Sequence, residues 1–127
     1  MVSSERRRKR PVETLKQRAD FNNIRVRGRS LSVNSWMLLR TCANSDGRLR
    51  IGFTFPRYVG PAVVRNRIRR WCREFFREYQ SQEKPDSGLD INVILKKRDK
   101  DFYDELSHDE ITKALGRAMP LLRGRRG

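Results

Sequence analysis

The feature that most constrains the fold is the distribution of side chains between residues 65 and 79. On a helix turning about 100° per residue, the apolar side chains fall at the i, i+3, i+4 and i+7 spacing of a core-facing stripe. The stripe consists of Ile68, Trp71, Cys72, Phe75, Phe76 and Tyr79. The pattern predicts an amphipathic helix from about residue 62 to residue 79, which has to pack its apolar side on another layer.

The opposite side of this predicted helix is rich in arginine. Arg65, Arg69 and Arg73 follow one another along a single ridge, with about 6 Å between neighbours. The remaining polar positions are Asn66, Arg70 and Arg77. Like charges at this spacing repel one another, and only Glu74 and Glu78 offer local compensation. An ordinary polar side mixes lysine, glutamate and glutamine, so the arginine ridge indicates contact with a polyanion.

The charge of the whole chain supports a polyanionic partner. Its 127 residues carry 30 lysines and arginines against 15 aspartates and glutamates, which gives a net charge of +15. Most of these cations are arginines, which fork onto phosphates and stack on bases, so nucleic acid is favoured over an acidic membrane surface. No apolar run approaches membrane-spanning length. We expect a cytoplasmic protein with no membrane partner.

The rest of the sequence predicts a single α+β domain. Asp46-Gly47 is a strong hairpin signal, and residues 49–55 alternate apolar and polar side chains as a half-buried strand does. Residues 89–95 have a nearly continuous apolar centre, which indicates a central strand. Basic arms are expected at residues 1–11 and 120–127. The predicted elements are a helix between Pro11 and Gly28, strands at 31–33, 36–42 and 49–55, a helix at 62–79, a strand at 89–95 and a helix at 101–119.

Side chains suited to cleaving a phosphodiester bond are sparse. Such chemistry needs paired carboxylates for metal ions or a histidine base. The only dense group of acids lies within residues 99–110, at the start of a predicted helix, and His108 is the only histidine. Cys42 and Cys72 match no zinc or redox spacing. We expect no catalytic and no metal-binding residue; a protein nuclease remains the alternative that would use the acids of 99–110.

Residues 60–77 resemble the signature of the bacterial ribonuclease P protein family. The family pattern is a glycine, an Ala-Val pair, Arg-Asn-Arg, a basic pair and an Arg-Glu-x-Phe-Arg-like continuation. Here these are Gly60, Ala62-Val63, Arg65-Asn66-Arg67, Arg69-Arg70 and residues 73–77. Weaker likenesses are Asp20-Phe21 with Gly28, Arg50-Ile51-Gly52 and Asp90-Ile91. The likeness covers about residues 15 to 119.

The resemblance implies an α-β-β-β-α-β-α sandwich with a four-stranded sheet. It implies a left-handed βαβ crossover into the central helix, although the usual handedness is right. It also implies two RNA contacts. The first faces the catalytic RNA through Arg65, Asn66, Arg67, Arg69, Arg70 and Arg73. The second is a cleft for the single-stranded 5′ leader of precursor tRNA, formed by Phe21, Arg25, Leu39, Thr54 and Arg57.

Four cleft positions either differ from the family pattern or have two interpretations. Arg25 and Leu39 stand where the family often has aromatic residues, and Arg25 can still stack on a base. Phe21 is either a stacking platform or an ordinary core residue. Arg57, where the family prefers lysine, is either a rim contact or part of an exposed loop.

By the same resemblance, the partners are the catalytic RNA and precursor tRNA. The RNA subunit carries the chemistry through Mg²⁺ ions that the RNA largely binds, and self-association is not predicted. A structural RNA-binding protein of ribosome or ribonucleoprotein assembly is the alternative, because the same basic helix would serve it.

Overall fold

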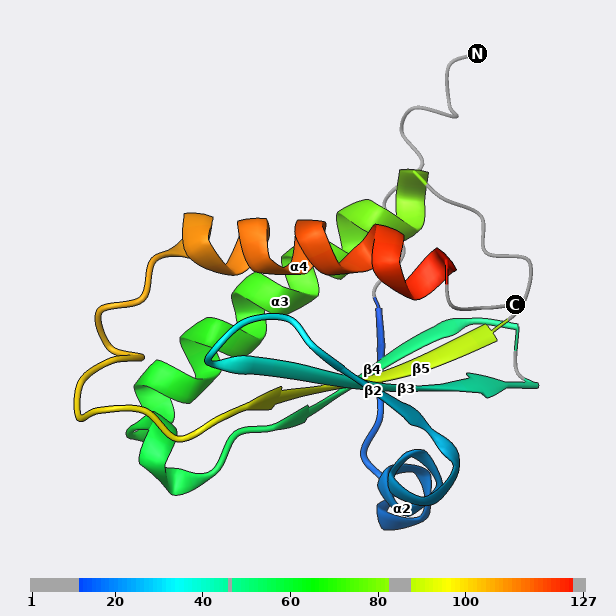
Figure 1. Cartoon of the computed structure of the whole chain (residues 1–127), viewed down its shortest axis with the longest axis horizontal. Helices are drawn as coiled ribbons and strands as arrows, with labels where there is room; N and C mark the ends of the chain where they lie inside the picture. Colours follow the sequence, from blue (N-terminus) through cyan, green and yellow to red (C-terminus); the bar gives the residue numbers. More distant parts are fainter. Residues whose placement is uncertain (1–11, 46, 83–87, 125–127) are drawn as a thin grey trace.

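The computed structural model describes residues 12–45, 47–82 and 88–124, and shows a mixed sheet with helices on both faces (Figure 1). Within these residues the sheet has five strands in the order β1-β4-β5-β3-β2. The elements are β1 (Glu13–Thr14), α2 (Arg18–Arg27), β2 (Arg29–Ser32), β3 (Met37–Asn44), β4 (Leu49–Thr54), the 3-10 helix η1 (Arg57–Val59), α3 (Ala62–Gln82), β5 (Gly88–Leu95) and α4 (His108–Gly124).

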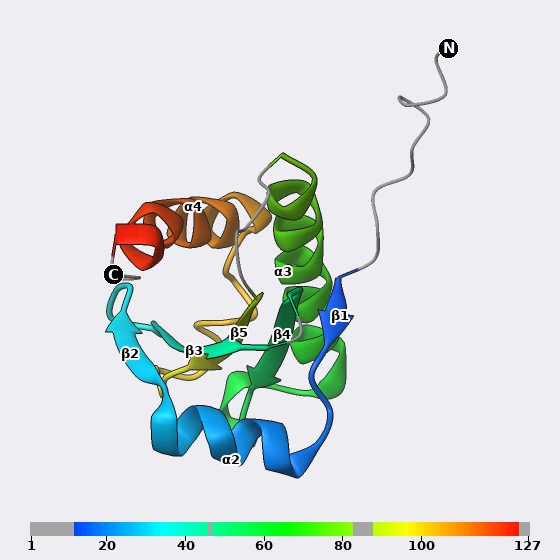
Figure 2. The ribbon, with the colours of Figure 1, turned by 90° about the vertical axis from the view of Figure 1, so that its right-hand side faces the viewer.

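The two faces of the sheet carry different layers (Figure 2). Helices α3 and α4 pack together over one face, whereas α2 lies alone across the other. The large hydrophobic core lies under α3 and α4, and Ile24 is the buried residue of α2. None of the helices in the described ranges is long and apolar enough to span a bilayer.

Strand β5 occupies the centre of the sheet, as its apolar sequence predicts. It pairs parallel with β4 and antiparallel with β3. Ile91, Val93 and Leu95 are fully buried in the core under α3 and α4, while Asp90 and Asn92 are buried among the side chains of the other face. Helix α3 connects the parallel neighbours β4 and β5, so the predicted βαβ crossover is confirmed. Its left-handedness stays a prediction.

The predicted hairpin, in which the strands at 36–42 and 49–55 pair directly with each other, is wrong. The chain does pass directly from β3, which ends at Asn44, to β4, which begins at Leu49, and Gly47 between them has a φ of 73°. However, β5 lies between these two strands and pairs with both of them. A turn signal is local, whereas strand pairing also depends on burial, and the apolar β5 gains the central position.

The start of the chain contains a strand that the sequence does not predict. Glu13 and Thr14 pair parallel with Arg50 and Ile51, which makes the sheet five-stranded instead of four-stranded. The backbone N–H of Leu15 extends this contact by donating to the carbonyl of Ile51 at 2.8 Å. Two residues are too few to show a period of two, so this strand leaves no sequence pattern.

Helix α4 begins and ends later than the predicted helix at 101–119. Ser107 and Glu110 form a reciprocal capping box that sets its start: the Ser107 N–H donates to Glu110 Oε1 at 2.9 Å, and the Glu110 N–H to Ser107 Oγ at 3.1 Å. Asp101, with φ of 68°, belongs to the preceding turns. The helix continues to Gly124, so residues 120–124 are no arm; residues 1–11 and 125–127 lie outside the described residues.

Candidate RNA interface

The apolar stripe of α3 packs into the core as predicted. Ile68, Cys72 and Phe76 are fully buried under the helix. Trp71, Phe75 and Tyr79 are partly buried at the margin of the same core. Burial raises the pKa of the Cys72 thiol to about 12, so this cysteine is an inert core residue. The packing fixes which side of α3 faces outward.

The arginine ridge lies along the flank of α3 that borders β4. The Arg69 guanidinium sits 5.5 Å from the centre of the Phe55 ring, and the Arg73 guanidinium sits 5.4 Å from the centre of the Phe53 ring. At the start of the helix, Arg65 Nε donates to the carbonyl of Gly60 at 3.0 Å. The aromatic rings and the carbonyl hold the three side chains in place, so the ridge is a preorganised cationic surface.

The charge of the ridge is poorly compensated. Partial desolvation, followed by the nearby charges of Arg65 and Arg73, lowers the pKa of Arg69 below its ordinary value. Within residues 12–45, 47–82 and 88–124, none of these three arginines forms an ion pair with a carboxylate. A phosphate backbone along the ridge would relieve this repulsion.

The crest of α3 carries Asn66 and Arg70, both exposed. Arg69 Nη1 donates to Asn66 Oδ1 at 2.6 Å, so the amide is oriented by the ridge beside it. Arg70 approaches Glu74 at 4.0 Å and remains 63% exposed. Both side chains are therefore accessible to a partner that lies along α3.

Arg67 is separated from the other five predicted contact residues. It lies on the far flank of α3, where its Nη2 donates to the carbonyl of Asp104 at 2.9 Å and lies 3.6 Å from the Asp104 carboxylate. Its guanidinium also packs over the Trp71 ring at 5.4 Å. This arginine joins α3 to the turn before α4, and only 31% of its side chain is exposed.

A cleft of about 360 Å³ lies between α2 and the sheet. Three predicted residues, Phe21, Arg25 and Thr54, line it. Phe21 is not a residue of the main core: its ring packs on Gly52, is only partly buried and borders the cleft, while its use as a stacking platform stays a prediction. The complete lining is Arg18, Phe21, Asn22, Arg25, Arg40, Thr54, Asn92 and Ile94.

The prediction that Leu39 lines this cleft is wrong. Leu39 is fully buried in the core on the opposite face of the sheet, and its neighbour Arg40 lines the cleft. Successive side chains of a strand point to opposite faces, so an error of one residue exchanges the two faces.

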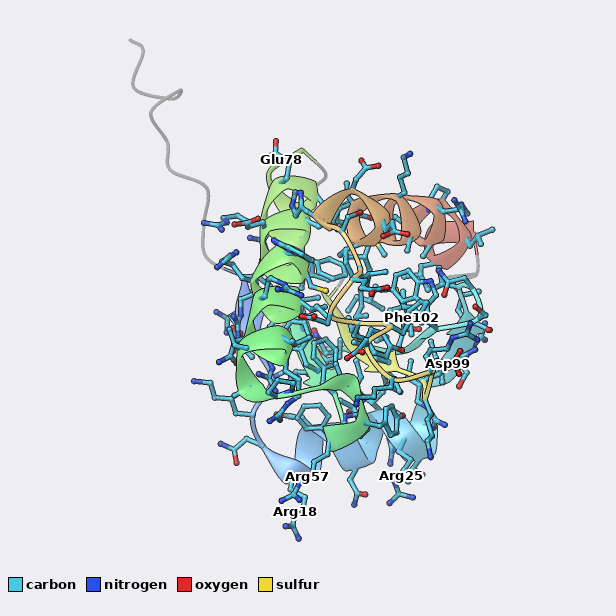
Figure 3. All side chains as sticks on the ribbon, turned by 90° about the vertical axis from the view of Figure 1, so that its left-hand side faces the viewer. Arg18, Arg25, Arg57, Glu78, Asp99 and Phe102 are labelled. Carbon is cyan, nitrogen blue, oxygen red and sulfur yellow. The ribbon has the colours of Figure 1, made fainter. Side chains whose placement is uncertain are left out.

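The predicted cleft residue Arg57 lies outside the lining. It is exposed on η1, at the same end of the molecule as Arg18 and Arg25 (Figure 3). The next residue, Tyr58, secures this turn, because its hydroxyl donates to the carbonyl of Leu95 at 2.8 Å. The structure therefore places Arg57 in an exposed turn, which is the second of its two sequence interpretations.

Sequence reasoning missed several polar residues of the cleft. Arg18 and Arg40 join Arg25, so three guanidinium groups and no carboxylate stand among the described residues that line it. Asn92 Nδ2 donates to Thr54 Oγ1 at 3.0 Å and forms a polar floor. The available signal was a polar residue in the middle of an apolar central strand, since buried polar residues are informative. The arrangement favours an anionic ligand with hydrogen-bonding groups.

The acids of residues 99–110 do not assemble into a site. His108 lies half-exposed at the start of α4, with its Nε2 at 3.5 Å from Glu74 Oε1 and its ring against Trp71. Asp104 is engaged with Arg67. In the described part of the chain, no group of three or more histidine, cysteine, aspartate or glutamate side chains could hold a metal ion.

Comparisons with known proteins agree with this geometry. The sequence matches the family model "Ribonuclease P" over residues 10–119. A ribonuclease P protein component from Gluconacetobacter diazotrophicus is 40% identical over 80 residues, which cover 63% of this chain and 68% of that protein. One from Clostridium kluyveri is 35% identical over 86 residues, which cover 68% and 76%.

Two solved structures of RNase P proteins also superpose on this chain. The RNase P protein from Thermotoga maritima superposes with a TM-score of 0.72 at 30% identity, covering 91% of this chain and 99% of that one. The RNase P protein of Staphylococcus aureus gives a TM-score of 0.74 at 27% identity, covering 88% and 96%. The motif around Arg65-Asn66-Arg67, the fold and these matches agree, and the chain belongs to the ribonuclease P protein family.

Proposed function

We propose that the chain is the protein subunit of ribonuclease P and assists removal of the 5′ leader from precursor tRNA. In this role it binds the catalytic RNA through the arginine side of α3, and the single-stranded leader through the cleft under α2. The observation that carries the proposal is the presence of two basic surfaces of different shape, a convex ridge and a concave cleft, on one domain of the family.

The ridge suits a folded RNA. Its guanidinium groups are spaced along a rigid helix and held by the rings of Phe53 and Phe55, so they can meet successive phosphates without losing much side-chain freedom. Asn66 and Arg70 on the crest add hydrogen-bond donors to the same surface. We propose that Arg67 contributes mainly by holding the turn before α4 against α3.

The cleft suits a single strand. Proteins bind single strands where cations follow the backbone and an aromatic side chain offers a stacking surface. Here Arg18, Arg25 and Arg40 supply the charge and Phe21 supplies the aromatic surface. With one phenylalanine and three arginines, we expect backbone charge and hydrogen bonds to contribute more than base stacking.

The proposal places the chemistry on the RNA subunit. Mg²⁺ ions bound largely by that RNA would activate the attacking water, and no step is assigned to a side chain of this protein. The protein would screen phosphate repulsion and hold the leader, which favours substrate binding at cellular ionic strength.

Reconstitution tests the proposal directly. The full chain is mixed with a bacterial ribonuclease P RNA and precursor tRNA at low Mg²⁺, and cleavage at the mature 5′ end is followed with and without the protein. We expect faster processing, and a larger gain for a substrate with a long leader than for one with a single-nucleotide leader. No gain with either substrate, together with co-migration with ribosomal particles, would favour a structural RNA-binding role instead.

A further inference from the structure

Arg50 lies where β4, β5 and α2 meet. Its Nε donates to Asp90 Oδ1 at 2.8 Å and its Nη2 to Asp90 Oδ2 at 2.9 Å, which is a bidentate pair between neighbouring strands. Asn44 Nδ2 on β3 donates to the same Asp90 Oδ1 at 2.6 Å. The Asp90 side chain is only 3% exposed, so the guanidinium has a fixed anchor within the sheet.

The same guanidinium also reaches across to α2. Its Nη2 lies 3.7 Å from Oδ1 of Asp20, which stands in the first turn of that helix. Both side chains are largely shielded, at 20% and 28% exposure. The residue after Asp20 is Phe21, so the contact with Arg50 lies directly beside the aromatic group of the cleft.

The contact with Asp20 and the cleft lie along one row of side chains on β4. Arg50, Gly52 and Thr54 point to the same face, because side chains two apart in a strand do so. Arg50 contacts Asp20, Gly52 receives the Phe21 ring, and Thr54 lines the cleft. A Cβ atom at Gly52 would lie 2.6 Å from Phe21 Cε1, so the ring rests directly on the strand backbone.

Helix α2 is held to the sheet by different residues at its two ends. Toward its C-terminal end, Ile24 is buried and Asn23 Nδ2 donates to Cys42 Sγ of β3 at 3.7 Å. At its N-terminal end, Gln17 makes no side-chain capping hydrogen bond, and the contacts of the first turn with β4 are those of Asp20 and Phe21. These contacts lie about one turn before Ile24, so they bear on the position of the first turn.

We propose that Arg50 is a positioning residue that sets the first turn of α2 over the sheet and thereby preforms the leader cleft. Arg50 does not line the cleft itself, and its pairing with Asp90 directs the guanidinium toward Asp20. The inference rests on the proposed function of the cleft. It goes beyond that function by assigning the cleft's shape to an ion pair between Arg50 and Asp20, which lies outside the cleft lining.

The test removes the contact at Asp20, because loss of Arg50 would leave the buried Asp90 without its cationic partner and destabilise the fold. Asp20→Asn keeps the size of the side chain, and Asp20→Glu keeps the charge. Glu13→Gln is the matched control, since it changes the net charge equally but removes the ion pair with Arg48 at the sheet edge. Each full-length variant is assembled with ribonuclease P RNA, and KM and kcat are measured for substrates with long and single-nucleotide leaders.

For Asp20→Asn we expect about a two- to fivefold rise in KM for the long-leader substrate, as for a partly exposed ion pair. The values of kcat and the affinity for ribonuclease P RNA should stay unchanged. Asp20→Glu should restore KM, and Glu13→Gln should match the parent chain. An Asp20→Asn variant with the same KM as Glu13→Gln overturns the proposal.

Amide hydrogen exchange of the free protein separates this inference from the proposed function. Asp20→Asn should speed exchange in the first turn of α2 relative to the segment around Ile24, whatever the cleft binds. Unchanged exchange there overturns the positioning role. If exchange increases but the parent enzyme shows no preference for a long leader, the positioning role stands and the leader-binding function fails.

Discussion

Replacing Arg65, Arg69 and Arg73 together by glutamine should weaken RNA binding and reduce its salt dependence, because both depend on the number of phosphate contacts. Glutamine removes the charge but keeps part of the stem that covers Phe53 and Phe55, so the edge of β4 stays shielded. The lost cation–π contacts cost about 0.5–1 kcal/mol each at such exposed sites. The variant should therefore remain folded, and its binding defect can be measured.

The size of the change in salt dependence follows from the number of phosphates that the ridge can reach. Each neutralised phosphate contributes about 0.7–0.9 to the slope of log K against log salt. Three contacts predict a slope smaller by about 2–3 in the variant. Between about 50 and 200 mM salt, the parent protein should then lose about thirtyfold more affinity than the variant does.

The assay is a salt titration of the affinity for ribonuclease P RNA, with Arg117→Gln as the charge control. Arg117 is an exposed arginine on α4, outside the arginine side of α3. Its variant should keep the parent slope. Equal slopes for the triple variant, the control and the parent would refute the assignment of the ridge to phosphate contact, even if the affinities differed.

Three further predictions concern the cleft and the core. Gly52→Ala places a Cβ atom 2.6 Å from the Phe21 ring and should push the ring into the cleft, which raises KM for long-leader substrates selectively; an unchanged KM would argue against this packing. Arg40→Gln should lower the salt slope of single-stranded leader binding by about 0.7, measured by fluorescence anisotropy, and an unchanged slope would remove Arg40 from the phosphate path. Burial raises the pKa of the Cys72 thiol from 9.0 to about 12, so the folded state keeps this proton while the unfolded state loses it above pH 9. The stability of the fold therefore falls as the pH rises from about 9 toward 12. A thiol reagent at pH 8 should leave Cys72 unlabelled until urea unfolds the chain.

Helix α3 shows what local sequence determines well. The spacing of Ile68, Trp71, Cys72, Phe75 and Phe76 separates a core side from an arginine side, and both lie where the sequence predicts. Helical spacing depends only on neighbours a few residues away, so a single segment contains the whole signal. By contrast, Arg67 looks equivalent to Arg69 in sequence, and only the turn around Asp104 sets it apart.

The cleft shows what only the tertiary structure decides. The sequence by itself determined the arginine side of α3 and the presence of apolar strands. It did not determine that β5 separates β3 from β4, or that Arg40 instead of Leu39 faces α2. Strand order and facing depend on long-range pairing, in which a shift of one residue exchanges the two faces. The cleft under α2 takes residues from α2, β3, β4 and β5, so its composition follows from that pairing and from no single segment.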